Sequence, residues 1–218
     1  MKTQKGMIGV LDLQGGVWEH LDHFERIGVA ASPVKEAAAL SSLAGLVIPG
    51  GESTCLSRLI RIFDLEKPII DACYQGTKLW GTCAGAILLA RSLKGEAPHL
   101  GMIDIELERN SFGSQLDSFV RKALIPKVAT TPLPLTFIRA PKIIRTGKGV
   151  EILLEIDDYI AAAETDQVLV TAFHPELTHS LAFHRYFARK CGLIPSSEKS
   201  SDDPGWQLTS WTRYNPAP

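Results

Sequence analysis

The chain has 218 residues, of which 45% are hydrophobic and 22% charged, and this composition excludes disorder over most of its length. A net charge of -1 provides no excess of positive charge for binding a nucleic-acid backbone or an anionic membrane. No apolar run reaches the roughly 20 residues that span a bilayer, and the first residues are too polar for a signal peptide, so we expect a cytoplasmic protein.

The first part of the chain alternates short apolar runs with segments of helical spacing. Strands are expected at residues 7–13, 31–34, 46–48 and 78–80, and helices at residues 17–27, 53–63, 67–75 and 86–91. Ser53 or Thr54 is the expected N-cap of the second of these helices. Because helices separate short apolar strands, the pattern favours an α/β fold with a doubly wound, mostly parallel sheet.

From residue 100 onward, short apolar runs are divided by Pro, Gly and Thr turns. Strands are expected at residues 102–107, 135–138, 150–155, 159–163 and 168–173, and a last amphipathic helix at residues 179–191. Hairpins among these strands would form an antiparallel extension at one edge of the sheet. The pattern therefore predicts a single domain over residues 1–194.

Residues 195–218 differ in composition, with four prolines and five serines, and we expect a flexible tail there. Trp206, Trp211 and Tyr214 leave an alternative open, since aromatic side chains are costly to expose. They would then dock on the body of the protein or on a partner.

The strongest local signal is Gly81-Thr-Cys-Ala-Gly85, a nucleophile elbow with cysteine in place of serine. A sharp turn from strand to helix lifts the nucleophile clear of the sheet, and flanking glycines avoid clashes. The helix N-terminus favours a thiolate at Cys83, and the N–H of Ala84 can stabilise an oxyanion. The alternative is a glycine-bracketed turn that holds a buried cysteine. The other three cysteines show no metal-finger spacing, and disulfides are not expected in the cytosol.

A thiolate nucleophile needs a base, and His174-Pro-Glu176 provides the best candidate. Pro175 favours an extended His174, which would place His174 and Glu176 on one side of the chain, so that Glu176 can orient the imidazole. The alternative is a histidine at a strand end beside a solvated glutamate. His20 and His23 in the first helix are expected to have a structural or surface role, and His179 and His184 in the last helix are expected on the surface.

Two further features point to a ligand. Pro49-Gly-Gly-Glu-Ser-Thr54 places two glycines between a strand and a helix N-terminus, although phosphate loops look similar; no Lys follows, which argues against a Walker loop. Arg109 and Arg139 stand at strand ends, where a guanidinium can bind a substrate carboxylate. A surface salt bridge is the alternative for either arginine.

Read together, these motifs resemble the signatures of the class I, or triad, glutamine amidotransferases. Additional blocks are similar to the glutaminase subunits of pyridoxal 5'-phosphate synthase within that family, over residues 7–192. These blocks are Gly9-Val-Leu-Asp-Leu-Gln-Gly15 with Glu19-His20, Glu108-Arg-Asn-Ser-Phe-Gly113 with Gln115 and Asp117-Ser-Phe119, Phe137-Ile-Arg-Ala-Pro141, and Phe173-His-Pro-Glu-Leu-Thr178.

The resemblance implies hydrolysis of L-glutamine to glutamate and ammonia, with the ammonia passing to a separate synthase subunit in a hetero-oligomer. It implies no metal and no organic cofactor. By the same resemblance Cys83 is the nucleophile, His174 the base and Glu176 its orienting acid. The residues implied in glutamine binding are Gly51, Glu52, Ser53, Arg109, Ile138 and Arg139, and the oxyanion hole is formed by Gly50, Gly51 and Ala84. Gln14 is expected near the face that docks the synthase.

The sequence departs from the family pattern at Asp12, Gly16 and Ser114. The first two lie near the expected docking face, so these departures affect the expected strength of synthase docking and not the expected glutamine hydrolysis. Three rival functions remain: a glutaminase of histidine or anthranilate synthesis, a binding protein that has lost turnover, and a thiol hydrolase of another substrate. The blocks at residues 108–119 and 137–141 argue against the first, and the intact Cys, His and Glu set argues against the second. The Pro-Gly-Gly-Glu-Ser loop and the two arginines favour an amino-acid substrate over the third.

Overall fold

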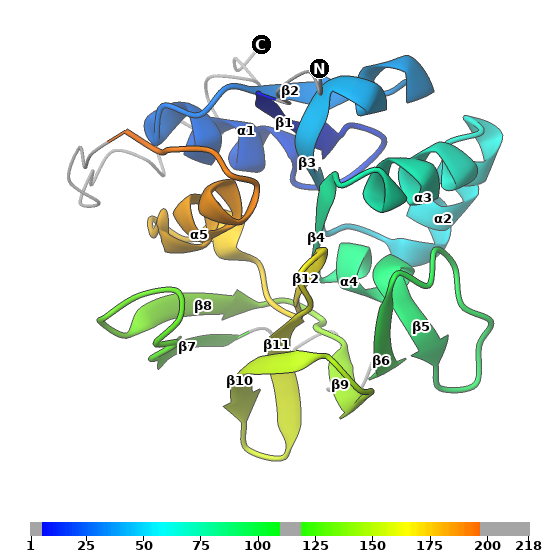
Figure 1. Cartoon of the computed structure of the whole chain (residues 1–218). Coiled ribbons are helices and arrows are strands. Elements are labelled where there is room, and N and C mark those ends of the chain that lie inside the picture. Colours follow the sequence, from blue (N-terminus) through cyan, green and yellow to red (C-terminus); the bar gives the residue numbers. More distant parts are fainter. Residues whose placement is uncertain (1–5, 110–118, 197–218) are drawn as a thin grey trace, which may run out of the picture.

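The computed structural model describes residues 6–109 and 119–196 (Figure 1). Its α-helices are α1 (Val17–Arg26), α2 (Ser53–Ile62), α3 (Glu66–Tyr74), α4 (Ala84–Leu89) and α5 (Ala182–Lys190), with 3-10 turns η1 (Ala37–Ser42) and η2 (Pro175–Leu177). The strands of the first part are β1 (Met7–Leu11), β2 (Ala31–Val34), β3 (Leu43–Ile48), β4 (Lys78–Thr82), β5 (Ala90–Leu93) and β6 (Ile103–Glu108). Those of the second part are β7 (Phe119–Ala123), β8 (Leu133–Phe137), β9 (Lys142–Thr146), β10 (Glu151–Ile156), β11 (Tyr159–Glu164) and β12 (Val168–Thr171).

Ten of these strands form one mixed sheet in the order β2-β1-β3-β4-β12-β11-β9-β6-β5, with β10 added on β11. The pairs from β2 to β12 are all parallel. The pairs β12–β11, β11–β9 and β9–β6 are antiparallel. The predicted α/β fold, a mostly parallel sheet with an antiparallel extension, is therefore confirmed. Strands β7 and β8 form a separate hairpin.

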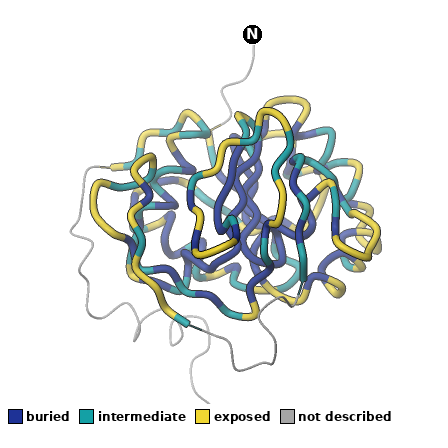
Figure 2. The backbone as a smooth tube through the Cα atoms, turned by 90° about the horizontal axis from the view of Figure 1, so that it is seen from below, coloured by how far each residue is buried: buried dark blue, intermediate teal, exposed yellow. Residues whose placement is uncertain are grey.

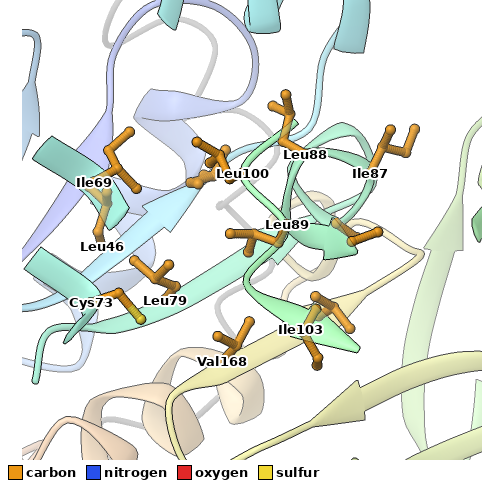
Figure 3. Close-up of a cluster of buried hydrophobic side chains, with 14 of the residues drawn as sticks. Leu46, Ile69, Cys73, Leu79, Ile87, Leu88, Leu89, Leu100, Ile103 and Val168 are labelled. Atoms are coloured by element: carbon orange, nitrogen blue, oxygen red, sulfur yellow. The ribbon is translucent and has the colours of Figure 1, made fainter. Parts of the chain in front are cut away.

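Two apolar cores lie on opposite faces of the parallel strands. Side chains alternate between the faces as the period of two requires, since Leu79 belongs to one core and Trp80 to the other. Helices α2, α3 and α4 cover the first core, part of which Figure 3 shows, and α1 and α5 cover the second (Figure 1). The central parallel strands β1, β3, β4 and β12 are buried almost throughout, and buried residues are dark blue in Figure 2. Burial on both sides of the sheet explains why these strands appear in the sequence as continuous apolar runs.

Several boundaries differ from the sequence prediction. Strands β5, β7 and β9 were not predicted. Strand β5 follows α4 directly, since the backbone becomes extended at Ala90. This change occurs inside a continuous apolar run with no turn residue, so the sequence pattern predicted only a helix there. Strand β7 has no buried residue and leaves Val120 exposed, so it lacks the alternation of a half-buried strand. The last helix begins at Ala182 and not at His179, and Glu52, not Ser53 or Thr54, caps α2.

Residues 1–5, 110–118 and 197–218 lie outside the described residues. The expectations for Ser114, for most of the Glu108–Phe119 block and for the tail with Trp206, Trp211 and Tyr214 therefore stay predictions. None of the helices in residues 6–109 and 119–196 has the length and apolar character that a membrane span requires.

Candidate active site

Four neighbouring parallel strands end at the same edge of the sheet, and the candidate site lies there. The carboxyl ends of β1, β3, β4 and β12 lead into the loops that carry the sequence motifs. They surround a pocket of about 320 Å³. The pocket is lined by every site residue that the sequence predicted: Gly50, Gly51, Glu52, Ser53, Cys83, Ala84, Arg109, Ile138, Arg139, His174 and Glu176.

The sequence did not single out Ile87, Pro141 and Leu177, which also line the pocket. Each directly follows or lies within one turn of a predicted motif, but an apolar lining residue carries no pattern of its own in the sequence. Gln14 and Gly16, which the sequence associated with docking, line the same pocket.

Cys83 stands at the turn from β4 into α4 with φ of 48° and ψ of -102°, a conformation that L-residues rarely adopt. Such strain costs about 1–3 kcal/mol and persists only where the surroundings enforce it. Close backbone packing enforces it here: a Cβ on Gly85 would lie 1.9 Å from the carbonyl oxygen of Ile48. A Cβ on Gly81 would lie 2.5 Å from the carbonyl of Gly85. The expected elbow geometry is therefore present.

His174 and Glu176 meet, but not in the extended segment that the sequence predicted. Pro175 begins the 3-10 turn η2, and Glu176 lies within that turn. Nδ1 of His174 lies 2.7 Å from Oε1 of Glu176, and both side chains are buried. The main-chain N–H of His174 donates to the carbonyl of Thr136, which anchors this end of β12 against β8.

Burial and neighbouring charges shift the pKa values of His174 and Glu176 in opposite directions. Burial alone would lower the pKa of His174, but the Glu176 carboxylate and the neighbouring Cys83 hold it well above its usual range. Burial works against the ionised form of Glu176, yet His174 and then His20 lower the pKa of its carboxyl to about 2. An ionised Glu176 therefore faces an imidazole that is biased toward the protonated form beside the Cys83 thiol.

The glycine loop after β3 is held against the loop after β1. The carbonyl of Gly50 accepts from the N–H of Gly16 at 3.3 Å, and the main-chain N–H of Glu52 donates to Oε1 of Gln14 at 3.0 Å. A Cβ on Gly50 would lie 2.3 Å from Cε1 of His174, so only glycine allows this approach. These contacts set the orientation of the peptide groups that face Cys83.

Glu52 and Arg109 are joined to each other at the pocket rim. The Glu52 carboxylate accepts from the N–H groups of Thr54 and Cys55, and these bonds lower its pKa. Arg109 donates to Glu96 at 2.7 Å and to the Thr54 hydroxyl at 3.3 Å, and its Nη2 lies 3.7 Å from Glu52. A guanidinium held on several sides is fixed in place for a ligand.

Arg139, the other predicted arginine, has a positive φ of 45° and lines the same pocket. Its neighbour Ile138 turns a carbonyl toward Cys83, whose sulfur lies 3.9 Å from that oxygen. No group of three or more His, Cys, Asp or Glu side chains in the described parts of the chain is arranged to hold a metal ion.

The structure corrects the expectation that His184 lies on the surface. His20, His23 and His184 are all fully buried between α1 and α5. Nδ1 of His20 lies 2.9 Å from Nε2 of His184, and both rings meet Trp80 edge to face. Helical spacing in α5 places His184 beside the buried Phe187 and Phe183, which is the signal that could have revealed it.

Acid should destabilise the protein through this cluster. Burial lowers the pKa of His20 and of His23 from 6.5 to about 4 and that of His184 well below 6.5. The unfolded chain therefore binds up to three more protons below pH 6.5, and stability present above that pH is lost as the pH falls toward the folded pKa values. We expect the free energy of unfolding in urea to fall by about 4 kcal/mol per pH unit from these three groups.

Two variants check the origin of this acid sensitivity. His184→Met should lower the slope by about a third, whereas a change of the exposed His179 to alanine should leave it unchanged. A free energy of unfolding that stays constant from pH 7 to about pH 5 would contradict the assignment of neutral buried imidazoles.

Comparison with known proteins gives a consistent result. The model of the SNO glutamine amidotransferase family matches residues 10–193. The protein named pyridoxal 5'-phosphate synthase subunit PdxT from Syntrophus aciditrophicus is 58% identical over 216 residues, 98% of this chain and 96% of that protein. The protein of the same name from Clostridium acetobutylicum is 45% identical over 183 residues, 84% of this chain and 98% of that protein.

Solved structures agree on the fold. One described as a crystal structure of glutamine amidotransferase superposes with a TM-score of 0.81 at 39% identity and covers 86% of this chain and 100% of that one. A chain in the structure of PurLQS from Thermotoga maritima superposes with a TM-score of 0.63 at 14% identity, over 85% of this chain and 99% of that one, which shows the fold alone.

Proposed function

The chain belongs to the SNO glutamine amidotransferase family, and we propose that its Cys83, His174 and Glu176 are the triad that hydrolyses L-glutamine. The chain is the glutaminase subunit of pyridoxal 5'-phosphate synthase, and its reaction releases glutamate and supplies ammonia for vitamin B6 synthesis. The observation that carries the triad is the arrangement of Cys83 at a strained elbow beside a histidine paired 2.7 Å from a buried carboxylate.

The reaction begins with the Cys83 thiolate, which a protonated His174 stabilises. The sulfur attacks the side-chain amide carbon of glutamine, and the carbonyl oxygen becomes an oxyanion. Main-chain N–H groups of Ala84 and of the Gly50-Gly51 loop hold that charge. His174 then gives its proton to the departing nitrogen, ammonia leaves, and a glutamyl thioester remains.

Water completes the cycle. His174, now neutral, takes a proton from a water molecule that attacks the thioester carbon, and glutamate leaves with the Cys83 sulfur restored. Glu176 stays ionised throughout, since it lies 2.7 Å from Nδ1 of His174 and orients the ring so that Nε2 serves the reaction.

The pocket rim recognises the amino-acid end of the substrate. Arg109 and Arg139 provide guanidinium groups for the substrate carboxylate, and Gly51, Glu52 and Ser53 contact glutamine at the start of α2. Glu96 holds Arg109 from the side away from Glu52, so the arginine is oriented before substrate arrives.

The synthase subunit docks near the loop after β1. Gln14 joins this loop to the oxyanion loop through Glu52, so a partner that moves Gln14 would act on the peptide groups around Cys83. Asp12 is paired with Lys35 at 3.2 Å, and Gly16 leaves space beside Glu176. The proposed domain covers residues 1–194, and residues 195–218 follow it as a tail.

The test measures glutamate release from L-glutamine, with and without the synthase subunit from the same source. We expect strong stimulation by the synthase that a Cys83→Ala variant lacks. Glutaminase activity that is equal with and without the synthase would be consistent with the proposed triad and would contradict docking of the synthase. Absence of glutamate under both conditions would contradict the proposed triad and leave a binding protein without turnover.

A further inference from the structure

The second oxygen of Glu176 points away from the catalytic histidine into the interior. While Oε1 pairs with His174, Oε2 lies 3.5 Å from Nε2 of His20, with both side chains at most 1% exposed. Among the described residues neither Oε2 nor Nε2 of His20 has a hydrogen-bond partner, so these two buried polar atoms face each other at 3.5 Å without a formed hydrogen bond. An ionised oxygen in a dry interior needs an N–H donor, so this contact matters for how the carboxylate is held.

The proton positions in this cluster follow from hydrogen-bond chemistry. Glu176 can only accept, so we place the ring proton of a neutral His20 on Nε2, where it faces the carboxylate. In a neutral ring Nδ1 of His20 is then an acceptor, and Nε2 of His184, 2.9 Å away, must donate to it. Nδ1 of His184 is left as a lone pair with no hydrogen-bond partner in the described chain, which costs less than an unpaired N–H.

Aromatic side chains pack closely around the two rings and restrict their movement. Trp80 contacts both rings edge to face, with centroids 5.3 Å from His20 and 5.0 Å from His184. Phe24 lies 4.9 Å from His184 on another side. The rings are thus fixed in place, and His20 presents its N–H to Glu176 without reorganisation.

We propose that His20 and His184 form a buried relay of positioning residues, in which His184 fixes the tautomer of His20 and His20 holds Oε2 of Glu176. The relay extends the triad inward, from helix α5 through α1 to η2, and keeps the carboxylate oriented and ionised while His174 moves its proton. This inference rests on the proposed function of Cys83, His174 and Glu176.

The groups that face the relay are few. Glu19, His23 and Arg26 approach it from α1, and His174 and Glu176 from the end of β12 and from η2. His23 instead contacts two main-chain carbonyls, of Glu19 and of Thr178, each at 2.9 Å. It has the same chemistry, helix and burial as His20, but both of its ring nitrogens face main-chain carbonyls, which makes it the matched control.

The test compares His20→Leu, His20→Gln and His23→Leu in the complex with the synthase subunit. Loss of one N–H donor to a charged oxygen corresponds to about a tenfold to hundredfold change. We expect His20→Leu to lower kcat by that factor with little change in KM. The acid limb of the kcat–pH profile should move to higher pH, because a carboxylate that loses a donor is protonated more easily.

The conservative variant separates positioning from packing. In His20→Gln the amide N–H can still face Glu176 and the amide oxygen can accept from His184, so most of kcat and the pH profile should return. His23→Leu should lose stability without the pH shift. A wild-type kcat and profile in His20→Leu, or equal losses in the three variants, would overturn the relay.

A second pair of variants applies if His20→Leu does not fold. His184→Met lacks the donor to His20 and should shift the profile in the same direction, whereas His184→Gln should restore it. If the kcat–pH profiles of His184→Met and His184→Gln were both the same as that of the wild type, the relay would also be overturned. An inactive wild-type complex would instead contradict the proposed triad, so the two failures are distinct.

Discussion

Replacing Cys83 by alanine is expected to lower the rate of glutamate release by on the order of 10⁴-fold or more. The sulfur forms the covalent bond to the substrate, and no other described thiol lines the pocket to replace it. Binding should survive, because the rim residues Arg109 and Arg139 and the loop at Gly51 are untouched. Titration calorimetry with L-glutamine on the inactive variant measures that binding without turnover.

Cys73→Ala is the matched control for this change. Cys73 is also a buried thiol, but it lies in α3 within the apolar core and away from the pocket. Its loss should reduce stability slightly and leave kcat unchanged. Substantial glutaminase activity in Cys83→Ala, or an equal loss in Cys73→Ala, would show that the nucleophile has been assigned wrongly.

Gly85→Ala is expected to destabilise the protein by more than about 3 kcal/mol and to abolish activity. In an ordinary helix this substitution would stabilise by about 1 kcal/mol, since alanine is the better helix former. Here the new methyl would lie 1.9 Å from the carbonyl oxygen of Ile48, a backbone atom that cannot move aside. Strand β3 and helix α4 must then separate, and Cys83 loses its position at the elbow.

Urea unfolding and glutaminase assays on the same preparation check this prediction. Gly76→Ala separates the clash from backbone strain, because Gly76 has a positive φ of 99° and a Cβ there would meet no heavy atom within 4 Å. It should cost about 1 kcal/mol and leave activity intact. Unchanged or raised stability in Gly85→Ala would contradict the close approach of β3 and α4.

Much of this architecture follows from local rules that the sequence displays. The alternation of short apolar runs with helical spacing predicted the parallel strands β1 to β4 and helices α1 to α3 to within a few residues. The elbow at Cys83 could be recognised because its glycines are needed by any chain that turns so sharply from strand to helix. Parallel strands bring their carboxyl ends together, so motifs that follow such strands were bound to meet.

The remaining elements depended on tertiary contacts. Strand β7 pairs with β8 although Val120, Arg121 and Lys122 are exposed, so pairing and not hydrophobic period defines it. Glu52 was predicted for the substrate and not for a cap, yet its carboxylate caps α2 by accepting from the N–H groups of Thr54 and Cys55. Glutamate is not among the residues preferred at an N-cap, so propensity favoured Ser53 or Thr54 there.

The sequence by itself determined the class of fold and singled out the candidate nucleophile, base and acid, because short motifs with restricted backbone geometry carry them. Only the tertiary structure decided which buried side chains lie next to Glu176. His20 and His184 come from opposite ends of the chain and meet Glu176 because α1 and α5 pack on the same face of the sheet. The environment of a buried polar group depends on which helices pack over it, and that is set by the burial of the whole core.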